Sequence, residues 1–246
     1  MIVKVLSSGS KGNSTLIKTK NINILIDAGI SAKELKKRIG VDNLKIDYLF
    51  ITHAHTDHTK GLKSIYKEFK PIVYTNNKEV IESEIVPTKS IDKNLILDSV
   101  TINCFNLSHD SDCVGFCIKE LDKEIVYITD TGYIKKDILA SIENKDMYIL
   151  ESNHDEEMLR HGKYPFFLQQ RILSDKGHLS NHDASKYLRK IAGDKTRYIV
   201  LAHLSEENNT KELAFEELEK ALKKADKKVK NIYIAKQEES LEEIEV

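Results

Sequence analysis

The sequence has few cysteines and no long apolar segment. Its 246 residues include only three cysteines, an odd number with no Cys-x-x-Cys pair. Cys104 and Cys117 lie in apolar, strand-like runs, which favours buried reduced thiols over disulfides. No apolar stretch reaches membrane-spanning length, and Met1–Lys4 does not begin a secretory signal pattern. We therefore expect a soluble, cytoplasmic protein without a membrane partner.

An excess of one charge sign is also missing, as are repeats and linkers. The formal net charge is −1, which gives no global electrostatic argument for binding nucleic acid. Any such binding would need a local basic groove. With 40% hydrophobic residues and no linker, we expect residues 1–246 to form a single domain with a full core.

Strand and helix patterns alternate along the chain. Ile2–Leu6 is expected to be a first strand, and Asn23–Asp27 a later strand that ends in its acidic residue. Ser31, with Glu34 three positions on, has the spacing of a helix capping box. Two strand-rich halves with helices indicate an α/β (α+β) protein with an αββα sandwich. The acidic segment Glu238–Val246 is expected to fray.

A cluster of imidazoles beside a carboxylate is the most informative segment. His53, His55, Asp57 and His58 lie within six positions, directly after the apolar run Ile46–Ile51. Imidazole nitrogens and carboxylate oxygens are ligands that zinc and similar divalent ions prefer. In an extended segment His53 and His55 point to one side, and a following helix turns Asp57 and His58 to another. A lone histidine is usually a surface residue, but this cluster predicts binding to two adjacent ions.

Three more candidate ligands each follow a strand-like run. They are His109 after Val100–Leu107, Asp130 after Ile125–Thr129, and His203 after Tyr198–Ala202. Strand ends converge at one edge of a sheet, where a rigid scaffold holds ligands that are scattered in sequence. The pattern therefore predicts one centre assembled from separate segments.

This pattern resembles the metallo-β-lactamase superfamily, whose signature is an Asp after an early strand, then His-x-His-x-Asp-His, His, Asp and His. The matching positions are Asp27, His53, His55, Asp57, His58, His109, Asp130 and His203. Residues 7–14, 151–155, 174–181 and 202–209 resemble the YycJ/WalJ (VicX) subgroup, which is found beside a bacterial two-component system. The resemblance covers nearly the whole chain and implies the four-layer αββα metallo-β-lactamase sandwich.

The resemblance also implies roles for these residues. His53, His55 and His109 would bind a first ion, and Asp57, His58 and His203 a second. Asp130 would bridge both ions through its two oxygens, Asp57 would also act catalytically, and Asp27 would support the ligand loop. Two such ions can clamp an in-line displacement at phosphorus.

A second pair matches the tRNA-3′-processing branch of the superfamily. There, a Glu after the corresponding strand and a His in a Gly-His turn protonate the leaving oxygen. Glu151 follows the apolar run Met147–Leu150, and His178 lies in a Gly-His-Leu-Ser turn. We expect Glu151 and His178 to form this catalytic pair. The alternative is that His178 caps a helix that begins near Asn181.

Several polar residues are weaker candidates for substrate contact. They are Ser8, Ser10 and Asn13, in a turn that would present N–H groups to a phosphate or simply form a hairpin, together with Asn153 and His154. Tyr164–Phe167 with Arg171 would be either a stacking platform for bases or part of the core. His161 and His182 are expected to be surface residues.

The favoured function is that of a dinuclear, metal-dependent phosphodiesterase that acts on nucleic acid. The subgroup resemblance implies, more narrowly, an exonuclease-like enzyme that acts on DNA. Mixed His/Asp sites accept Zn²⁺, Mn²⁺ or Fe²⁺. One alternative is hydrolysis of a small ester, thioester, lactam or cyclic phosphodiester. Another is a non-catalytic, metal-bound regulator of a two-component system. A proton-donating pair argues against thioesters and lactams, since a thiolate leaves without an acid.

Overall fold

The computed structural model describes residues 1–40 and 44–246, which contain two seven-stranded sheets. The first sheet has, in spatial order, β14 (Ile244–Glu245), β1 (Ile2–Ser7), β2 (Ser14–Lys18), β3 (Asn23–Ile26), β4 (Tyr48–Phe50), β5 (Ile72–Tyr74) and β6 (Thr88–Lys89). The second has β13 (Asn231–Ile234), β12 (Tyr198–Ala202), β11 (Met147–Glu151), β10 (Lys123–Ile128), β9 (Val114–Glu120), β8 (Val100–Asn106) and β7 (Asn94–Leu97).

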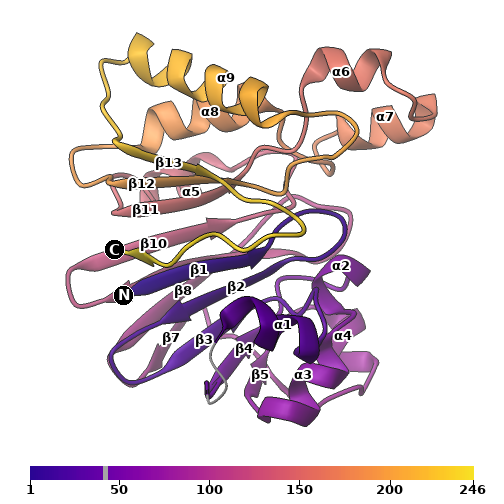
Figure 1. The fold of residues 1–246 in the computed structure, drawn as a ribbon, viewed down its shortest axis with the longest axis vertical. Helices are drawn as coiled ribbons and strands as arrows, with labels where there is room; N and C mark the ends of the chain where they lie inside the picture. Colours follow the sequence, from indigo (N-terminus) through magenta and orange to yellow (C-terminus); the bar gives the residue numbers. More distant parts are fainter. Residues whose placement is uncertain (41–43) are drawn as a thin grey trace.

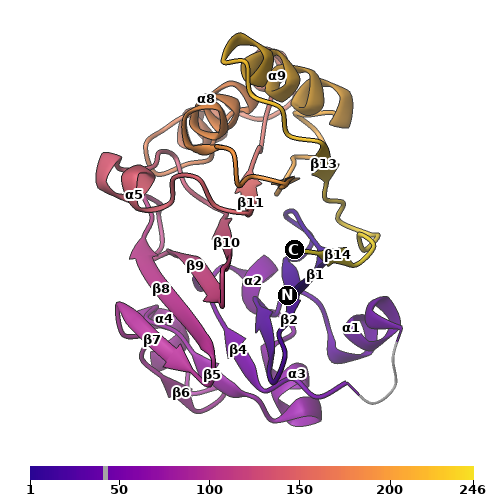
Figure 2. The same ribbon diagram turned by 90° about the vertical axis from the view of Figure 1, so that its left-hand side faces the viewer.

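Helices cover the outer face of each sheet (Figure 1). They are α1 (Ala32–Ile39), α2 (Thr56–Thr59), α3 (Leu62–Phe69) and α4 (Lys78–Glu82) beside the first sheet, then α5 (Lys136–Ser141), α6 (Glu156–His161), α7 (Phe166–Ile172), α8 (Asn181–Ile191) and α9 (Lys211–Lys224). In both views α8 and α9 lie at one end of the molecule and α1 and α3 at the other (Figure 2). Within the described chain, no helix combines the length and apolar character that crossing a membrane requires.

Alternation of apolar side chains along the strands builds the layers. In β3, Ile24 and Ile26 join the core between the two sheets, whereas Leu25 packs with α1 and α3. In β10, Ile125 joins the central core and Val126 faces α5, α8 and α9. Successive strand residues point to opposite faces, so each sheet is buried on both sides. This arrangement confirms the predicted αββα sandwich.

The first helix begins where the capping spacing predicted. Ser31 Oγ accepts a hydrogen bond from the backbone N–H of Glu34. Only half of the capping box is present, because the Glu34 carboxylate accepts from Arg38 Nε instead of reaching back to Ser31. The helix ends at Gly40, whose left-handed backbone (φ 76°) is typical of a helix C-terminus.

The C-terminal segment does not fray, so that expectation was wrong. Ile244 and Glu245 form β14, which pairs antiparallel with the first strand, and the N–H of Val246 donates to the carbonyl of Met1. Ile244 and Val246 are buried in the central core. The acidic residues alternate with these apolar ones, and their number obscured a short strand with one buried face.

Candidate metal centre and active site

The candidate ligands meet at the edge of the sandwich where several strands of both sheets end. Asp27 follows β3, His53 comes soon after β4, His109 follows β8, Asp130 follows β10 and His203 follows β12. Parallel pairing of β3 with β4, of β10 with β11, and of β11 with β12 aligns the C-terminal ends of these strands. The fold therefore gathers side chains from segments that are far apart in sequence.

Three of these residues have a backbone conformation that is uncommon outside glycine. Asp27, Asp130 and His203 have φ of 63°, 58° and 55°; Asp27 and His203 directly follow their strands, and Asp130 follows its strand after one residue. Asp, Asn and His tolerate this left-handed region better than most residues. The strand runs predicted to reach Asp27 and Thr129 accordingly end earlier, at Ile26 and Ile128. The left-handed turn lets each side chain leave the sheet and point into the centre.

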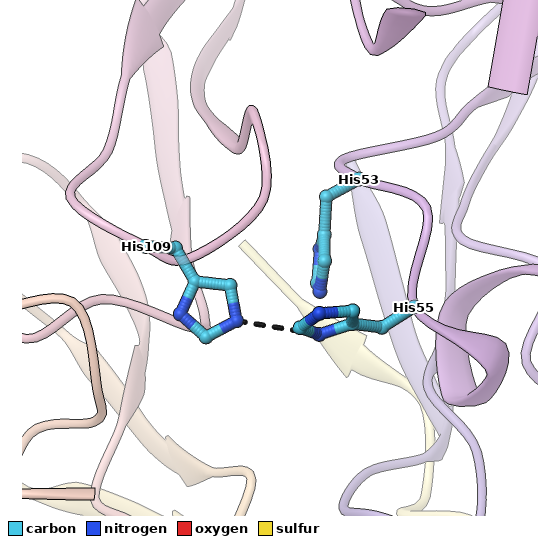
Figure 3. Close-up of side chains that lie close together, drawn as sticks. All are labelled: His53, His55 and His109. Atoms are coloured by element: carbon cyan, nitrogen blue, oxygen red, sulfur yellow. Dashed lines mark hydrogen bonds between the residues drawn. The ribbon is translucent and has the colours of Figure 1, made fainter. Parts of the chain in front are cut away.

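The first group consists of three imidazoles, His53, His55 and His109 (Figure 3). His109 comes from the segment after β8, whereas His53 and His55 come from the opposite side. His109 Nε2 lies 3.3 Å from His55 Nδ1, and His53 Nε2 is buried without a hydrogen-bond partner. The strand β4 ends at Phe50, so His53 and His55 follow this strand and are not part of it.

The second group consists of Asp57, His58 and His203. Asp57 Oδ2 lies 3.3 Å from Nε2 of both His58 and His203. Asp57 and His58 both lie on the separate short helix α2, which precedes α3 and brings their side chains to His203. Asp130 lies between the groups, because one of its oxygens clusters with ligand nitrogens of both His53 and His58.

The donor set fits divalent cations. The Nδ1 of His58 lies 2.7 Å from Asp27 Oδ2, so a neutral His58 that donates there turns the lone pair of Nε2 towards carboxylate oxygens. Its Nε2 is 3.2 Å from Asp130 Oδ2, which makes no hydrogen bond. The Asn13 amide lies 2.9 Å from this Nε2, but the facing Asp130 Oδ2, which has no hydrogen-bond donor, still needs a proton or a cation. Together with the unpartnered His53 Nε2, this geometry matches the residues to bound metal.

The electrostatics of the two groups differ. Burial lowers the pKa of His53 and His109, which keeps these imidazoles neutral, the form in which they bind metal. Burial also lowers the pKa of His58 and His203, but neighbouring carboxylates, Asp130 among them, outweigh it and hold both pKa values well above the ordinary one. In the second group a proton and a divalent cation therefore compete for the same place.

Asp27 and Thr52 fix the orientation of the ligands. Asp27 Oδ1 accepts from the backbone N–H of Thr52, and the Thr52 hydroxyl lies 3.0 Å from both Asp27 oxygens. The same hydroxyl lies 3.0 Å from His53 Nδ1. Asp27 thus contacts His58 directly and His53 through Thr52. Such partners set which ring nitrogen is free to bind metal.

The Ser/Gly-rich turn after β1 also supports the centre from within. Asn13 Nδ2 donates to Asp57 Oδ2, and Ser8 Oγ accepts from the backbone N–H of His203. A β-carbon on Gly29 would lie 1.9 Å from the carbonyl of Asp57 and 2.2 Å from the nitrogen of Asn13, so only glycine allows this close approach. Ser8 and Asn13 are buried, and their contact with a substrate stays a prediction.

Glu151 and His178 lie together beside the ligands. His178 Nδ1 is 2.6 Å from Glu151 Oε1, and Glu151 Oε2 accepts from the backbone N–H groups of Thr131 and Leu179. Glu151 Oε1 is also 3.2 Å from His203 Nδ1. Ser180, and not His178, caps the helix that begins at Asn181. The pairing expected from the sequence is therefore present, and the capping alternative is wrong.

This pair is strongly polarised. Burial raises the pKa of Glu151, but the imidazoles of His178 and His203 outweigh it and lower that pKa to about 2. Burial lowers the pKa of His178, but Glu151 outweighs it and holds that pKa above its ordinary value. Each partner therefore stabilises the charged form of the other. A protonated imidazole next to the ligands can donate a proton to a leaving group.

The remaining polar candidates have different positions. Ser10 is exposed and, with Asn153, lines a hollow that also contains His109, His178 and His203. Asn153 Nδ2 donates to the carbonyl of His203. His154 is 1% exposed, both of its ring nitrogens lack a partner among the described residues, and burial lowers its pKa to about 4. His161 and His182 are exposed, as expected.

Three residues that the sequence did not single out contribute to the centre: Thr52, Asp110 and Asn209. Asp110 Oδ1 lies 3.3 Å from His55 Nε2 and 3.2 Å from His109 Nε2. Asn209 Nδ2 donates to the carbonyls of Ser152 and Asn153, next to Glu151. Their place in the sequence was the only sign of these roles. Thr52 and Asp110 are next to predicted ligands, and Asn209 lies in a segment that resembles the subgroup.

Comparison with known proteins agrees with this geometry. Residues 22–204 match the model of the β-lactamase superfamily domain. The chain is 36% identical over 237 residues to exodeoxyribonuclease WalJ of Streptococcus pneumoniae, covering 90% of this chain and 88% of that protein. It is also 36% identical over 223 residues to exodeoxyribonuclease YycJ of Bacillus anthracis, covering 85% of this chain and 84% of that protein.

Solved structures show the same fold at low sequence identity. The metallo-β-lactamase fold protein YhfI of Bacillus subtilis superposes with a TM-score of 0.72 at 19% identity, over 98% of each chain. Human tRNase Z, short form, superposes with a TM-score of 0.65 at 16% identity, over 98% of this chain and 99% of that one. The chain therefore belongs to the β-lactamase superfamily, in the branch that contains WalJ and YycJ.

Proposed function

We propose that this protein is a metal-dependent exonuclease that hydrolyses phosphodiester bonds of DNA with two divalent ions. The observation that carries the proposal is the shared position of Asp130 between the two ligand groups, with Glu151 and His178 directly beside them. The proposal is supported by 36% identity, over 90% of the chain, to a protein named exodeoxyribonuclease. We also propose that the protein acts in the cytoplasm and that residues 1–246 form one domain.

Each group would hold one ion, and Asp130 would bind both. His53, His55 and His109 would hold the first; Asp57, His58 and His203 would hold the second. The ions would supply activation of water and neutralisation of charge on the phosphate. Zn²⁺, Mn²⁺ and Fe²⁺ all suit mixed imidazole and carboxylate ligands.

The chain's own residues would then complete the reaction. Asp27 and Thr52 hold His58 and His53 in the tautomers that leave Nε2 available. Glu151 would stabilise the protonated form of His178, which would donate its proton to the departing sugar oxygen. A leaving alkoxide needs such an acid, whereas a thiolate does not. This pair favours phosphodiesters over thioesters.

A panel of substrates separates this function from its alternatives. Protein reconstituted with Zn²⁺ or Mn²⁺ would be incubated with end-labelled DNA, RNA, bis-p-nitrophenyl phosphate and a thioester, with the Asp130→Ala variant as control. We expect stepwise release of nucleotides from DNA, which is lost after chelation and in the variant. Cleavage of the thioester alone would assign the protein to small-ester hydrolysis. Full metal occupancy without any cleavage would favour a regulatory role.

A further inference from the structure

The short helix α7 exposes aromatic side chains that no other element covers. None of its seven residues is buried. Phe166 and Phe167 are 74% and 73% exposed, whereas the other exposed aromatics, Tyr133 and Phe215, are each 37% exposed. Adjacent exposed apolar side chains can form an interaction surface, whereas isolated ones such as Leu121 are normal.

This helix is connected to the first imidazole group through Asp110. Arg171 Nε donates to Asp110 Oδ2, while Asp110 Oδ1 lies within 3.3 Å of the Nε2 atoms of His55 and His109. Leu168, Arg171 and Ile172 line the same hollow as His109, His178 and His203. Figure 1 shows α6 and α7 projecting from the end of the second sheet, on the side of the molecule where α2 lies.

Helical geometry distinguishes the two phenylalanines. Residues four apart lie on the same side of an α-helix, so Phe167 lies one turn before Arg171 and next to the lining face. Phe166 precedes Arg171 by five residues and is rotated away from that face. Neither phenylalanine is among the residues that line the hollow, but of these two neighbours with similar exposure, Phe167 lies closer on the helix to the lining residue Arg171.

The hollow beside α7 is lined by two basic side chains, Arg171 and Lys176, and by no acidic side chain among the described residues. Arg171 uses Nε and Nη2 on Asp110, which leaves other guanidinium N–H groups for an anion. Basic groups beside an exposed aromatic ring are the combination that binds single-stranded nucleic acid, with bases stacked and phosphates paired.

We propose that Phe167, with Arg171 and Lys176, receives a single-stranded segment of the DNA substrate, with one base stacked on the Phe167 ring beside the scissile phosphate. The inference rests on the proposed function and names the form of DNA that the site takes. Inside a duplex, neighbouring base pairs cover the faces of each base, so a ring that stacks on a single base favours an unpaired end. Arg171 and Lys176 also line the hollow, so the surface around Phe167 leads into it. This favours DNA over a protein partner, which would not require the basic side chains.

The test compares Phe167→Ala with Phe166→Ala on a single-stranded oligonucleotide. Stacking of one base on an aromatic ring is worth about 1–3 kcal/mol, so Phe167→Ala is expected to raise KM about tenfold. Phe166→Ala, the matched control, is expected to raise it less than about twofold. The loss in Phe167→Ala on the oligonucleotide should exceed any loss on bis-p-nitrophenyl phosphate, which carries no base, by about tenfold. Equal effects of the two substitutions would overturn the assignment.

An abasic oligonucleotide identifies the stacked group. Removing the bases near the scissile phosphate should raise KM of the wild-type protein about tenfold, and have little further effect in Phe167→Ala, because the two changes remove one contact. Independent losses would overturn the proposal. Wild-type protein that cleaves bis-p-nitrophenyl phosphate but no DNA would remove the proposed function and this inference with it. DNA cleavage that does not respond to Phe167→Ala would overturn the stacking alone.

A second copy of the chain is the competing occupant of this surface. Sedimentation of the wild-type protein and of Phe167→Ala, at the concentrations used for the assay, distinguishes the two. We expect the same mass for both proteins. A dimer that Phe167→Ala dissociates, with KM unchanged, would assign the surface to contact between copies and overturn the proposal.

Discussion

Replacing His178 by Ala tests whether this imidazole donates a proton. Its Nδ1 is held 2.6 Å from a fully buried carboxylate oxygen of Glu151, and the residue lines the hollow next to His109 and His203. His178 belongs to neither of the two groups assigned to the ions. We therefore expect His178→Ala to keep its metal and lose the proton donor.

The size of the loss should depend on the leaving group. General acid catalysis contributes about 10²–10⁴-fold, so cleavage of a DNA dinucleotide, whose alkoxide is a poor leaving group, should slow by that factor. Hydrolysis of bis-p-nitrophenyl phosphate should suffer far less, because p-nitrophenolate leaves without a proton. Steady-state rates on both substrates, with metal content measured on the same sample, give the comparison.

The pH dependence provides a second reading with a definite sign. The acid works only while His178 is protonated, and Glu151 holds the pKa of His178 above its ordinary value. Activity on the alkoxide substrate should therefore be retained through neutral pH and fall as pH rises through this raised pKa. In Glu151→Gln the stabilising charge is absent, so the fall should begin at lower pH. The change in this profile separates proton donation from a structural role.

Equal losses of His178→Ala on both substrates would refute the reasoning, because they would mean that His178 positions the phosphate or the fold. Loss of metal from the variant would instead mean that His178 is a ligand. Its Nδ1 lies 3.7 Å from Asp130 Oδ1, so the two atoms are close enough to bind the same ion. An unchanged pH profile in Glu151→Gln would refute the electrostatic role of Glu151.

Three further changes test other parts of the centre. Asp130→Ala should reduce metal content below two ions per chain and abolish cleavage, as elemental analysis and the DNA assay would show; full occupancy with full activity would contradict the bridging role. Thr52→Val removes the hydroxyl between Asp27 and His53 and should weaken metal binding by about 10–100-fold, measured by competition with a chelator. Asn209→Ala leaves the carbonyl of Ser152 without this donor, whereas the carbonyl of Asn153 still accepts from the backbone N–H of Ser205; the free energy of unfolding should fall by roughly 1–3 kcal/mol in denaturant titrations, and an unchanged value would mean that water replaces the amide.

The layers of the fold follow from patterns that the sequence shows directly. Segments such as Ile24–Ile26 and Ile125–Ile128 are continuously apolar. Because successive side chains of a strand point to opposite faces, such a run places apolar side chains on both faces, and both segments form strands as predicted. The last strand escaped notice because acidic residues dominate its composition, although Ile244 and Val246 keep the same alternation. Composition averages over the two faces of a strand, whereas burial depends on one face.

The ligand set was easier to predict than its supports. A ligand such as His53 must be a residue type that binds metal, and its type and spacing remain visible in one dimension. Thr52 contributes through a hydroxyl whose importance depends on Asp27, which is 25 residues away in sequence. Asp110 acts through its place between His55 and Arg171, which only the folded chain defines. Contacts of this kind have no local signature.

The centre combines features that would each destabilise an ordinary protein interior. Asp27, Asp130 and His203 have left-handed backbone, and such conformations are of order 1–3 kcal/mol less favourable each. Asp130 and Glu151 are also buried carboxylates, which require cationic partners. In the folded chain, the only buried partners available to Asp130 in the described residues are imidazoles, and these carry the compensating charge only when protonated. Divalent cations supply that charge while leaving the imidazoles neutral, so metal binding and the stability of this edge of the fold are physically coupled.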